Sequence, residues 1–413
     1  MKTNWKLLAA AFIACSMMTT ACNDDNGGGD PDPGLKGEIP ARTTLSGNIT
    51  SDATLTEGNA YRLSGGLHVK AGATLRIEPG VELVAVDDEM PDYILIEQGA
   101  KIDAQGTALK PVVMTSELKE AGAWGGIHIC GRAHTNAGAG VLSEIGNAPY
   151  GGDDDADNSG TLRYIRLEYT GFALDEEHEA NGVSFYGVGS GTTVEYLQAY
   201  KGSDDGFEFF GGSVNVKYMV VTSCSDDSFD WTEGWNGKGQ FLVAYQEAES
   251  TLGYDCDCLM ECDNNGNNAA ATPVAHPVLA NVTLVGNSST TGTRGVRLRA
   301  GTEVELYNAI VTGKAKCITV ETPETENSFS KSQNPSKLEY VSMSTVLDSK
   351  QGIYTNDDFV AATGNVTDYV NALTGKYVGT ISGGKTLADS FFTAAAYKGA
   401  VPASDDWTVG WTK

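Results

Sequence analysis

The stretch that begins at Asn181 reads NGVSFYGVGSGTTVEYLQAY, and two more follow it at a spacing of 22 residues: SDDGFEFFGGSVNVKYMVVT from Ser203 and SDDSFDWTEGWNGKGQFLVA from Ser225. In each, short apolar alternations are separated by turns of Gly, Ser, Asn and Asp. A fixed period of this length, made of strand-like pieces, indicates a solenoid whose coils stack on one another.

Alignment of the three stretches places like side chains in columns. The columns hold Phe185, Phe207 and Phe229; Val194 and Val216; and Tyr196 and Tyr218. Strands this short bury their inward side chains only by stacking on the next coil, which produces parallel sheets. The sequence therefore predicts an all-β chain folded as a right-handed parallel β-helix. A β-sandwich or propeller is the competing fold, but a propeller blade needs about 40 residues.

Looser copies extend the pattern in both directions. HVKAGATLRIEPG from His68 matches LIEQGAKIDAQGT from Leu95 at an offset of 27 residues, and further apolar runs begin at Leu162, Leu279, Leu306 and Leu338. We expect N-terminal coils and a cap over residues 42–120, a central β-helix with inserted loops over 121–350, and a C-terminal cap region over 351–413.

The N-terminus reads as an export signal. Lys2 and Lys6 precede an apolar run, and the small residues that follow end at Cys22. This pattern predicts a signal peptide over residues 1–21. It resembles the lipobox of bacterial lipoproteins, which implies that Cys22 is acylated and anchors the protein to a membrane; ordinary secretion with cleavage elsewhere is the alternative. The polar, glycine-rich segment of residues 22–41 is expected to be a flexible tether.

The composition limits the partners. The chain has 54 acidic and 28 basic residues and a formal net charge of −26. This charge argues against nucleic acid, or an anionic polysaccharide held by charge alone, and favours cations or neutral ligands. We expect a monomer anchored in the outer membrane, facing the cell surface, whose partner is a glycan or a surface protein.

Several segments resemble a family of Bacteroidota envelope proteins, mostly uncharacterised, that are parallel β-helix lipoproteins or secreted repeat proteins. The matching pieces are GATLRIEPGVEL, GTALKPVVMTS, AWGGIHICGRA, YGGDDDADNSGTLRYIRLEYTG, SDDGFEFFGGSVNVKY, MECDNN and FFTAAAYKGAVPASDDWTVGWT. The resemblance runs from about His68 to Thr412 and implies the fold and an envelope location. It implies no reaction.

Acidic residues also fall in columns. The repeat stacks Asp204 on Asp226, Asp205 on Asp227 and Glu208 on Asp230. Like charges about 4.8 Å apart on neighbouring strands repel, so something must relieve them. A Ca²⁺ site would do so, because this ion binds several carboxylate oxygens. Two alternatives stay open: the acids satisfy turn backbone groups, or they are catalytic carboxylates.

Two further clusters invite a metal interpretation. Asp153, Asp155 and Asp157 alternate as in a calcium loop, but the glycine and the final glutamate of an EF-hand are missing, so a solvated turn is equally compatible. Cys256, Cys258 and Cys262 lack the paired C-x2-C arms of zinc sites. In an exported protein this spacing favours disulfides.

Basic and aromatic residues could contact a ligand. Arg297 and Arg299 should share one strand face, with Val296 and Leu298 on the other. An arginine beside calcium resembles the base of β-helix polysaccharide lyases, although a salt bridge to the acidic coils explains the same residues. Trp231 and Trp235 could stack on sugar rings or belong to a buried aromatic ladder.

The sequence therefore favours a surface binding protein that recognises glycan or protein ligands without catalysis and is stabilised by calcium. A polysaccharide lyase or hydrolase and a structural or adhesive stalk are the alternatives, since β-helices serve all three roles.

Overall fold

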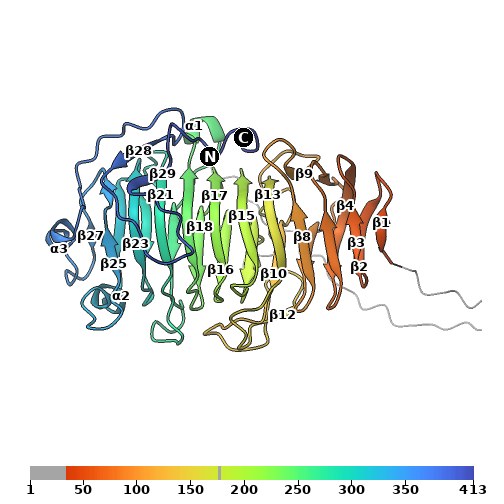
Figure 1. Cartoon of the computed structure of the whole chain (residues 1–413), viewed down its shortest axis with the longest axis horizontal. Helices are drawn as coiled ribbons and strands as arrows, with labels where there is room; N and C mark the ends of the chain where they lie inside the picture. The colour runs from red at the N-terminus through yellow and green to blue at the C-terminus, as the bar shows by residue number, and fades with distance from the viewer. Residues whose placement is uncertain (1–33, 175–177) are drawn as a thin grey trace, which may run out of the picture. The chain divides into compact units, whose positions relative to one another are not determined.

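The structure, a computed structural model, describes residues 34–174 and 178–413. The expected signal peptide, the lipidation site Cys22 and most of the expected tether lie outside the described residues. Residues 34–413 form one compact unit. Its strands stack in parallel into a right-handed β-helix, as the repeat predicted (Figure 1). Among the described residues, no helix is long and apolar enough to cross a membrane.

Each coil contributes to three parallel sheets, which we call faces A, B and C. Face A begins with the ends of β2 (Thr44–Ile49) and β4 (Ala60–Val69) and continues through β7 (Tyr93–Ile96), β10 (Ile127–Cys130), β14 (Val183–Tyr186), β16 (Phe207–Phe210), β18 (Phe229–Thr232), β20 (Met260–Cys262), β22 (Arg294–Leu298), β24 (Lys316–Val320) and β27 (Asp348–Ser349).

Faces B and C have separate strands in the first coils. Face B holds β1 (Gly37–Ile39), β3 (Ala53–Leu55), β5 (Thr74–Ile77) and β8 (Lys101–Gln105), and face C holds the starts of β2 and β4, then β6 (Glu82–Ala85) and β9 (Val112–Ser116). The strand β1 begins inside the segment predicted to be a tether, so that expectation is wrong from Gly37 onward.

In later coils one long strand serves both faces. These strands are β13 (Gly160–Glu168), β15 (Thr193–Tyr200), β17 (Asn215–Thr222), β19 (Lys238–Tyr245), β21 (Val278–Val285) and β23 (Glu305–Thr312), and β25 (Lys337–Glu339) and β26 (Ser342–Met343) end the stack. Each bends where one residue adopts a left-handed φ of 50–60°; these residues are Tyr164, Tyr196, Tyr218, Phe241, Asn281 and Asn308. They form the corner between faces B and C, opposite face A.

The strand register confirms most of the predicted alignment. His68 pairs with Leu95, and Val194 with Val216. One column is wrong at its first member: Phe185 pairs with Phe209, and Phe207 pairs with Val183, although Phe207 pairs with Phe229 as predicted. The turn between β14 and β15 spans residues 187–192, whereas the turn between β16 and β17 spans only 211–214. The first coil is therefore two residues longer than the spacing of 22 that the alignment assumed.

The remaining elements lie outside the three faces. A hairpin of β11 (Val141–Leu142) and β12 (Pro149–Tyr150) belongs to the insertion after β10, and the short helices are α1 (Glu249–Leu252), α2 (Pro323–Ser328) and α3 (Asn356–Ala361). The predicted cap is only partly a cap. Residues around α3 pack on the last coil, but β28 (Gly379–Ser382), β29 (Tyr397–Val401) and the C-terminus return along the helix as far as β13.

Candidate functional site: the charged surface of face A

The outward side chains of face A form a ladder of charges. By strand register, Glu208, Asp230, Glu261 and Arg297 occupy successive rungs. Their neighbours in the strands point inward to the core, so each of these four coils places one charge on the same line of the surface. The pairing of Glu208 with Asp230 confirms the stacking that the repeat predicted.

The turns that lead into face A add a second set of carboxylates. The backbone N–H of Asp227 donates to Asp205 Oδ1 over 2.8 Å, and that of Cys258 donates to Asp227 Oδ1 over 2.6 Å. Backbone N–H groups of the turns therefore donate to Asp205 and Asp227, which agrees with the alternative that these acids bind turn backbone groups. Each of these bonds uses only one oxygen of the carboxylate, so the repulsion between neighbouring carboxylates remains.

The carboxylates lie close enough to share a cation. Ligand atoms of Asp205, Glu208 and Asp230 all lie within 4.8 Å of one another, as do those of Asp227, Asp230 and Glu261. The two groups share Asp230, whose Oδ1 is sheltered from solvent and has no hydrogen-bond partner. A third group, Asp204, Asp205 and Asp226, adjoins them. This oxygen-rich set fits a hard cation such as Ca²⁺.

Burial and mutual repulsion raise the pKa values of these acidic groups. Burial, then the carboxylates of Glu179 and Asp226, raises the pKa of Asp204 to about 7. Burial, then Asp257 and Glu261, raises the pKa of Asp226 to about 6. Burial together with neighbouring acids raises the pKa values of the four inner carboxylates well above their ordinary range: Asp205, Glu208, Asp227 and Asp230.

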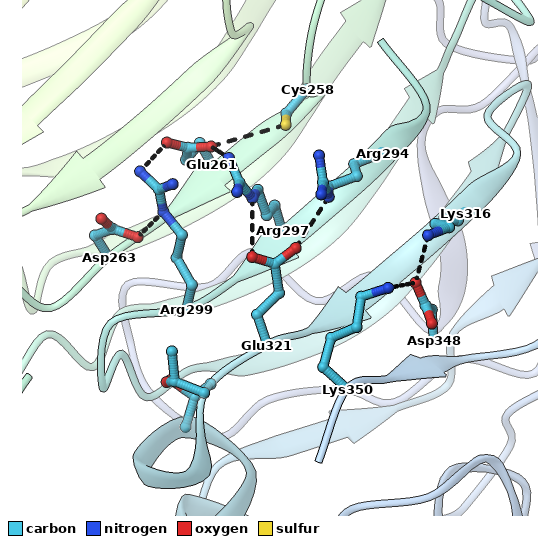
Figure 2. Close-up of polar contacts among 12 residues, drawn as sticks. Cys258, Glu261, Asp263, Arg294, Arg297, Arg299, Lys316, Glu321, Asp348 and Lys350 are labelled. Atoms are coloured by element: carbon cyan, nitrogen blue, oxygen red, sulfur yellow. Dashed lines mark hydrogen bonds and ion pairs between the residues drawn. The ribbon is translucent and has the colours of Figure 1, made fainter. Parts of the chain in front are cut away.

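Arginines close the other end of the ladder (Figure 2). Arg297 Nη1 lies 2.7 Å from Glu261 Oε1, and its Nε lies 3.2 Å from Glu321 Oε2. Arg299 contacts Glu261 and also Asp263, at 2.7 Å. Arg297 and Arg299 are partly exposed whereas Val296 and Leu298 are buried, so both arginines are on the outer face, as predicted. The salt-bridge interpretation of these residues is confirmed, and hydrogen bonding to Glu261 contributes to a raised pKa of Arg297, which opposes a role as a base.

Sequence reasoning missed residues that complete this surface. Glu261 follows Asp230 by 31 residues rather than 22, because the loop that contains α1 lengthens that coil. Asn181 Nδ2 donates to Glu208 Oε2 over 2.7 Å. Glu144, from the insertion after β10, adds to the acidity: burial raises its pKa to about 7, and its charge raises the pKa of Asp204. No repeat signal could have located Glu144.

The second acidic loop does not gather its carboxylates. Asp155 Oδ1 accepts hydrogen bonds from the backbone N–H and Nδ1 of His134, at 3.1 and 2.6 Å. Asp157 Oδ2 accepts from the backbone of Arg132, and Asp153 is exposed. Over residues 34–174 and 178–413, no group of three ligand atoms within 4.8 Å includes any of these aspartates. The geometry corresponds to the turn alternative.

The disulfide expectation is wrong. The six cysteines among the described residues are free and buried: Cys130, Cys224, Cys256, Cys258, Cys262 and Cys317. Cys262 packs inside the β-helix between Trp231 and Leu298 on the neighbouring coils, so its position follows from packing. Cys258 is at the edge of the acidic column, with its Sγ 4.0 Å from Glu261 Oε1.

The tryptophans do not face a ligand. Trp231 and Trp235 are each 1% exposed, which rules out stacking on a sugar ring, and the expected ligand-binding role is wrong. Trp231 alternates with the outward Asp230 and therefore points into the core, where it contacts Trp235. The buried-ladder interpretation holds for both, and Phe209 stacks on Trp235 at 4.2 Å between ring centroids.

Comparison with known proteins adds one finding. A family model described as a pectate-lyase-like β-helix domain matches residues 47–412. Neither the curated proteins nor the solved structures contain a match.

Proposed function

Because the chain belongs to the family of pectate-lyase-like β-helix domains, we propose that face A binds a divalent cation, calcium in the first place, and through it holds an extracellular glycan without cleaving it. The observation that carries this proposal is that the two sets of three carboxylates share Asp230, whose buried Oδ1 has no hydrogen-bond partner. Buried acids without a counter-charge are costly, and a cation would remove that cost.

The glycan would meet both charges of the ladder. A cation held by Asp205, Glu208 and Asp230 would offset most of the negative charge of these three carboxylates and offer a positive centre to a ligand, and Arg299 offers a side chain that is 33% exposed nearby. Carboxylate or hydroxyl groups of a sugar could bind the cation and the guanidinium together. Through the cation and the guanidinium, an acidic protein could bind a glycan that carries negative charge.

Calcium titration tests the cation site. A ligand that binds only the folded state raises the melting temperature by mass action, so millimolar Ca²⁺ should raise it in the wild type. Replacing both Asp204 and Asp226, or Asp230 alone, by Asn should remove the increment. Asp153→Asn is the matched control and should retain it. A melting curve that calcium leaves unmoved would refute the site.

The lyase alternative is favoured by the family and by the position of Arg297 one rung from Glu261. A lyase needs a base within reach of the proton it removes, but Arg297 is engaged by Glu261 and Glu321. Unsaturated-uronide absorbance that disappears in Arg297→Ala would establish the lyase instead.

The envelope location belongs to the same proposal. It is supported by the N-terminal pattern that ends at Cys22. Cys22→Ala should move the full-length protein from the membrane fraction to the soluble fraction, because a lipid chain is the expected anchor. A variant that stays in the membrane fraction would contradict the anchor.

The structural or adhesive stalk is the remaining alternative. It would be supported if neither calcium nor any glycan bound to the protein.

A further inference from the structure

A second candidate site lies on the corner between faces B and C, on the side of the β-helix opposite the carboxylates. A cavity of about 540 Å³ opens there, which is within the usual size range of small-molecule sites. Its floor is the aromatic corner ladder of Tyr164, Tyr196, Tyr218 and Phe241, and its roof is the returning C-terminal tail, including Trp407. We call it the corner groove.

The floor of the groove is a regular stack of aromatic rings. The centroids of Tyr164 and Tyr196, and of Tyr196 and Tyr218, are 4.3 Å apart, and those of Tyr218 and Phe241 are 4.9 Å apart, with nearly parallel planes. Because the ring faces cover one another, the edges and hydroxyls are left to line the groove. Trp407 stands at 69° to Tyr218 with its centroid 5.1 Å away and is only half-buried.

The charges of the groove select the ligand class. Its charged lining residues are Asp405 and Asp406, and the lining contains no lysine or arginine. Asp406 Oδ1 accepts hydrogen bonds from the backbone N–H and the hydroxyl of Thr408. The Asp405 side chain is exposed and makes no hydrogen bond to any described residue. Two carboxylates disfavour an anion, whereas aromatic edges, tyrosine hydroxyls and a free carboxylate suit a neutral polyhydroxyl compound.

We propose that the corner groove binds a neutral saccharide of one or two sugar units, with its apolar face against Trp407 and its hydroxyls on Asp405 and the tyrosine ladder. The groove is formed by different residues from face A, and its ligand requires no cation. The proposal therefore does not depend on the calcium site. It gives the β-helix two binding sites on opposite sides of the same coils.

The test is calorimetric titration of the full-length protein with cellobiose, xylobiose, maltose and mannobiose, in EDTA. At least one should bind and change the fluorescence of Trp407, and digalacturonate should not compete. Trp407→Ala should weaken binding about tenfold or more, the effect of one aromatic contact. Asp405→Asn and Tyr218→Phe should also weaken it, and neither is expected to unfold the protein. Tyr200→Phe, on the neighbouring strand β15 and outside the groove, is the matched control.

The outcomes separate the two sites. Asp205→Asn and Asp230→Asn should leave the saccharide affinity unchanged, and Trp407→Ala should leave the calcium response unchanged. Failure of every neutral saccharide to bind, equal binding of digalacturonate, or equal losses in Tyr218→Phe and Tyr200→Phe would overturn the corner-groove proposal. None of these results would affect the calcium titration, so failure of one proposal cannot be mistaken for failure of the other.

Discussion

Glu261 is the residue at which the charge of face A changes sign. On one side it adjoins the carboxylates of Asp227 and Asp230, and on the other it pairs with Arg297 and Arg299. The arginines in turn contact Glu321 and Asp263 (Figure 2). A salt-bridged network beside an unpaired acidic cluster localises the unsatisfied charge to a few residues, as a cation site requires.

The network should contribute measurably to stability. Glu321 is 16% exposed and pairs with Arg294 and Arg297. We expect Glu321→Gln to lower the free energy of unfolding by about 1–2 kcal/mol, because two partly buried guanidinium groups lose a charged acceptor. Glu195→Gln is the control: its partner Arg163 is 44% exposed, so solvent screening should limit the loss to less than about 1 kcal/mol. Urea titrations that give equal losses would contradict this.

The thiols provide a second test at the residue scale. Burial raises the pKa of Cys130, Cys224 and Cys256 to about 12, so little thiolate forms at neutral pH. A thiol-specific reagent should leave the six buried thiols of the described residues unlabelled in the folded protein, and all six should react after denaturation without a reductant. Fewer than six would mean that disulfides form after all.

At the scale of elements, the corner between faces B and C shows where the sequence was informative and where it was not. Alignment placed Tyr196 over Tyr218 correctly, because both coils have the same length there. It misplaced Phe185, because the turn after β14 has six residues and the turn after β16 has four. The sequence pattern does not show this difference in turn length. The left-handed conformation of the corner residues is also invisible in the repeat, since tyrosine rarely adopts it.

The corner also holds the C-terminal tail. Asn308 has a φ of 57°; its Nδ2 donates to the carbonyl of Lys385 over 2.8 Å, and its Oδ1 accepts from the backbone N–H of Lys385 over 2.7 Å. Asn281 similarly donates to the carbonyl of Tyr397. The side-chain amides of these two corner residues thus hold the tail against the β-helix.

Substitutions at Asn308 separate the contribution of its side-chain hydrogen bonds from that of its left-handed backbone conformation. Asn308→Gly loses the amide bonds but tolerates the positive φ, whereas Asn308→Ala loses the bonds and adds backbone strain of about 1 kcal/mol. Both should speed amide hydrogen exchange at Lys385, and Asn308→Ala should have the lower melting temperature. Unchanged exchange in both variants would show that the tail is held by other contacts.

At the scale of the molecule, the acidic column could be predicted because its members lie in coils of equal length. Glu261 and Glu144 could not, because loops of irregular length bring them to the site. The burial of Trp231 could have been predicted: if Asp230 points outward, its neighbour in the strand points inward. The sequence pattern therefore predicts the stacked carboxylates of the site, whereas Glu261 and Glu144 are brought to it by loops that the pattern does not describe.

The acidic column should also set the pH dependence of the whole fold. Carboxyls with raised pKa values bind protons more tightly in the folded state than in the unfolded state, so their contribution is lost as pH rises. For Asp204 the window runs from its ordinary pKa of 3.8 to about 7, and for Asp226 to about 6. In EDTA we therefore expect the melting temperature to fall between pH 5 and pH 8.

Calcium should reverse that fall, because the ion favours the ionised carboxylates and its stabilisation should be larger at pH 8 than at pH 5. Asp204→Asn should flatten the pH dependence in EDTA, since the amide does not titrate, whereas Asp153→Asn should leave it as in the wild type. Calorimetric scans at several pH values, with and without calcium, measure all of these effects. A melting temperature that rises steadily from pH 5 to pH 8 in EDTA would show that the column is not the dominant titrating group. The case for a cation on face A would then lose its electrostatic basis.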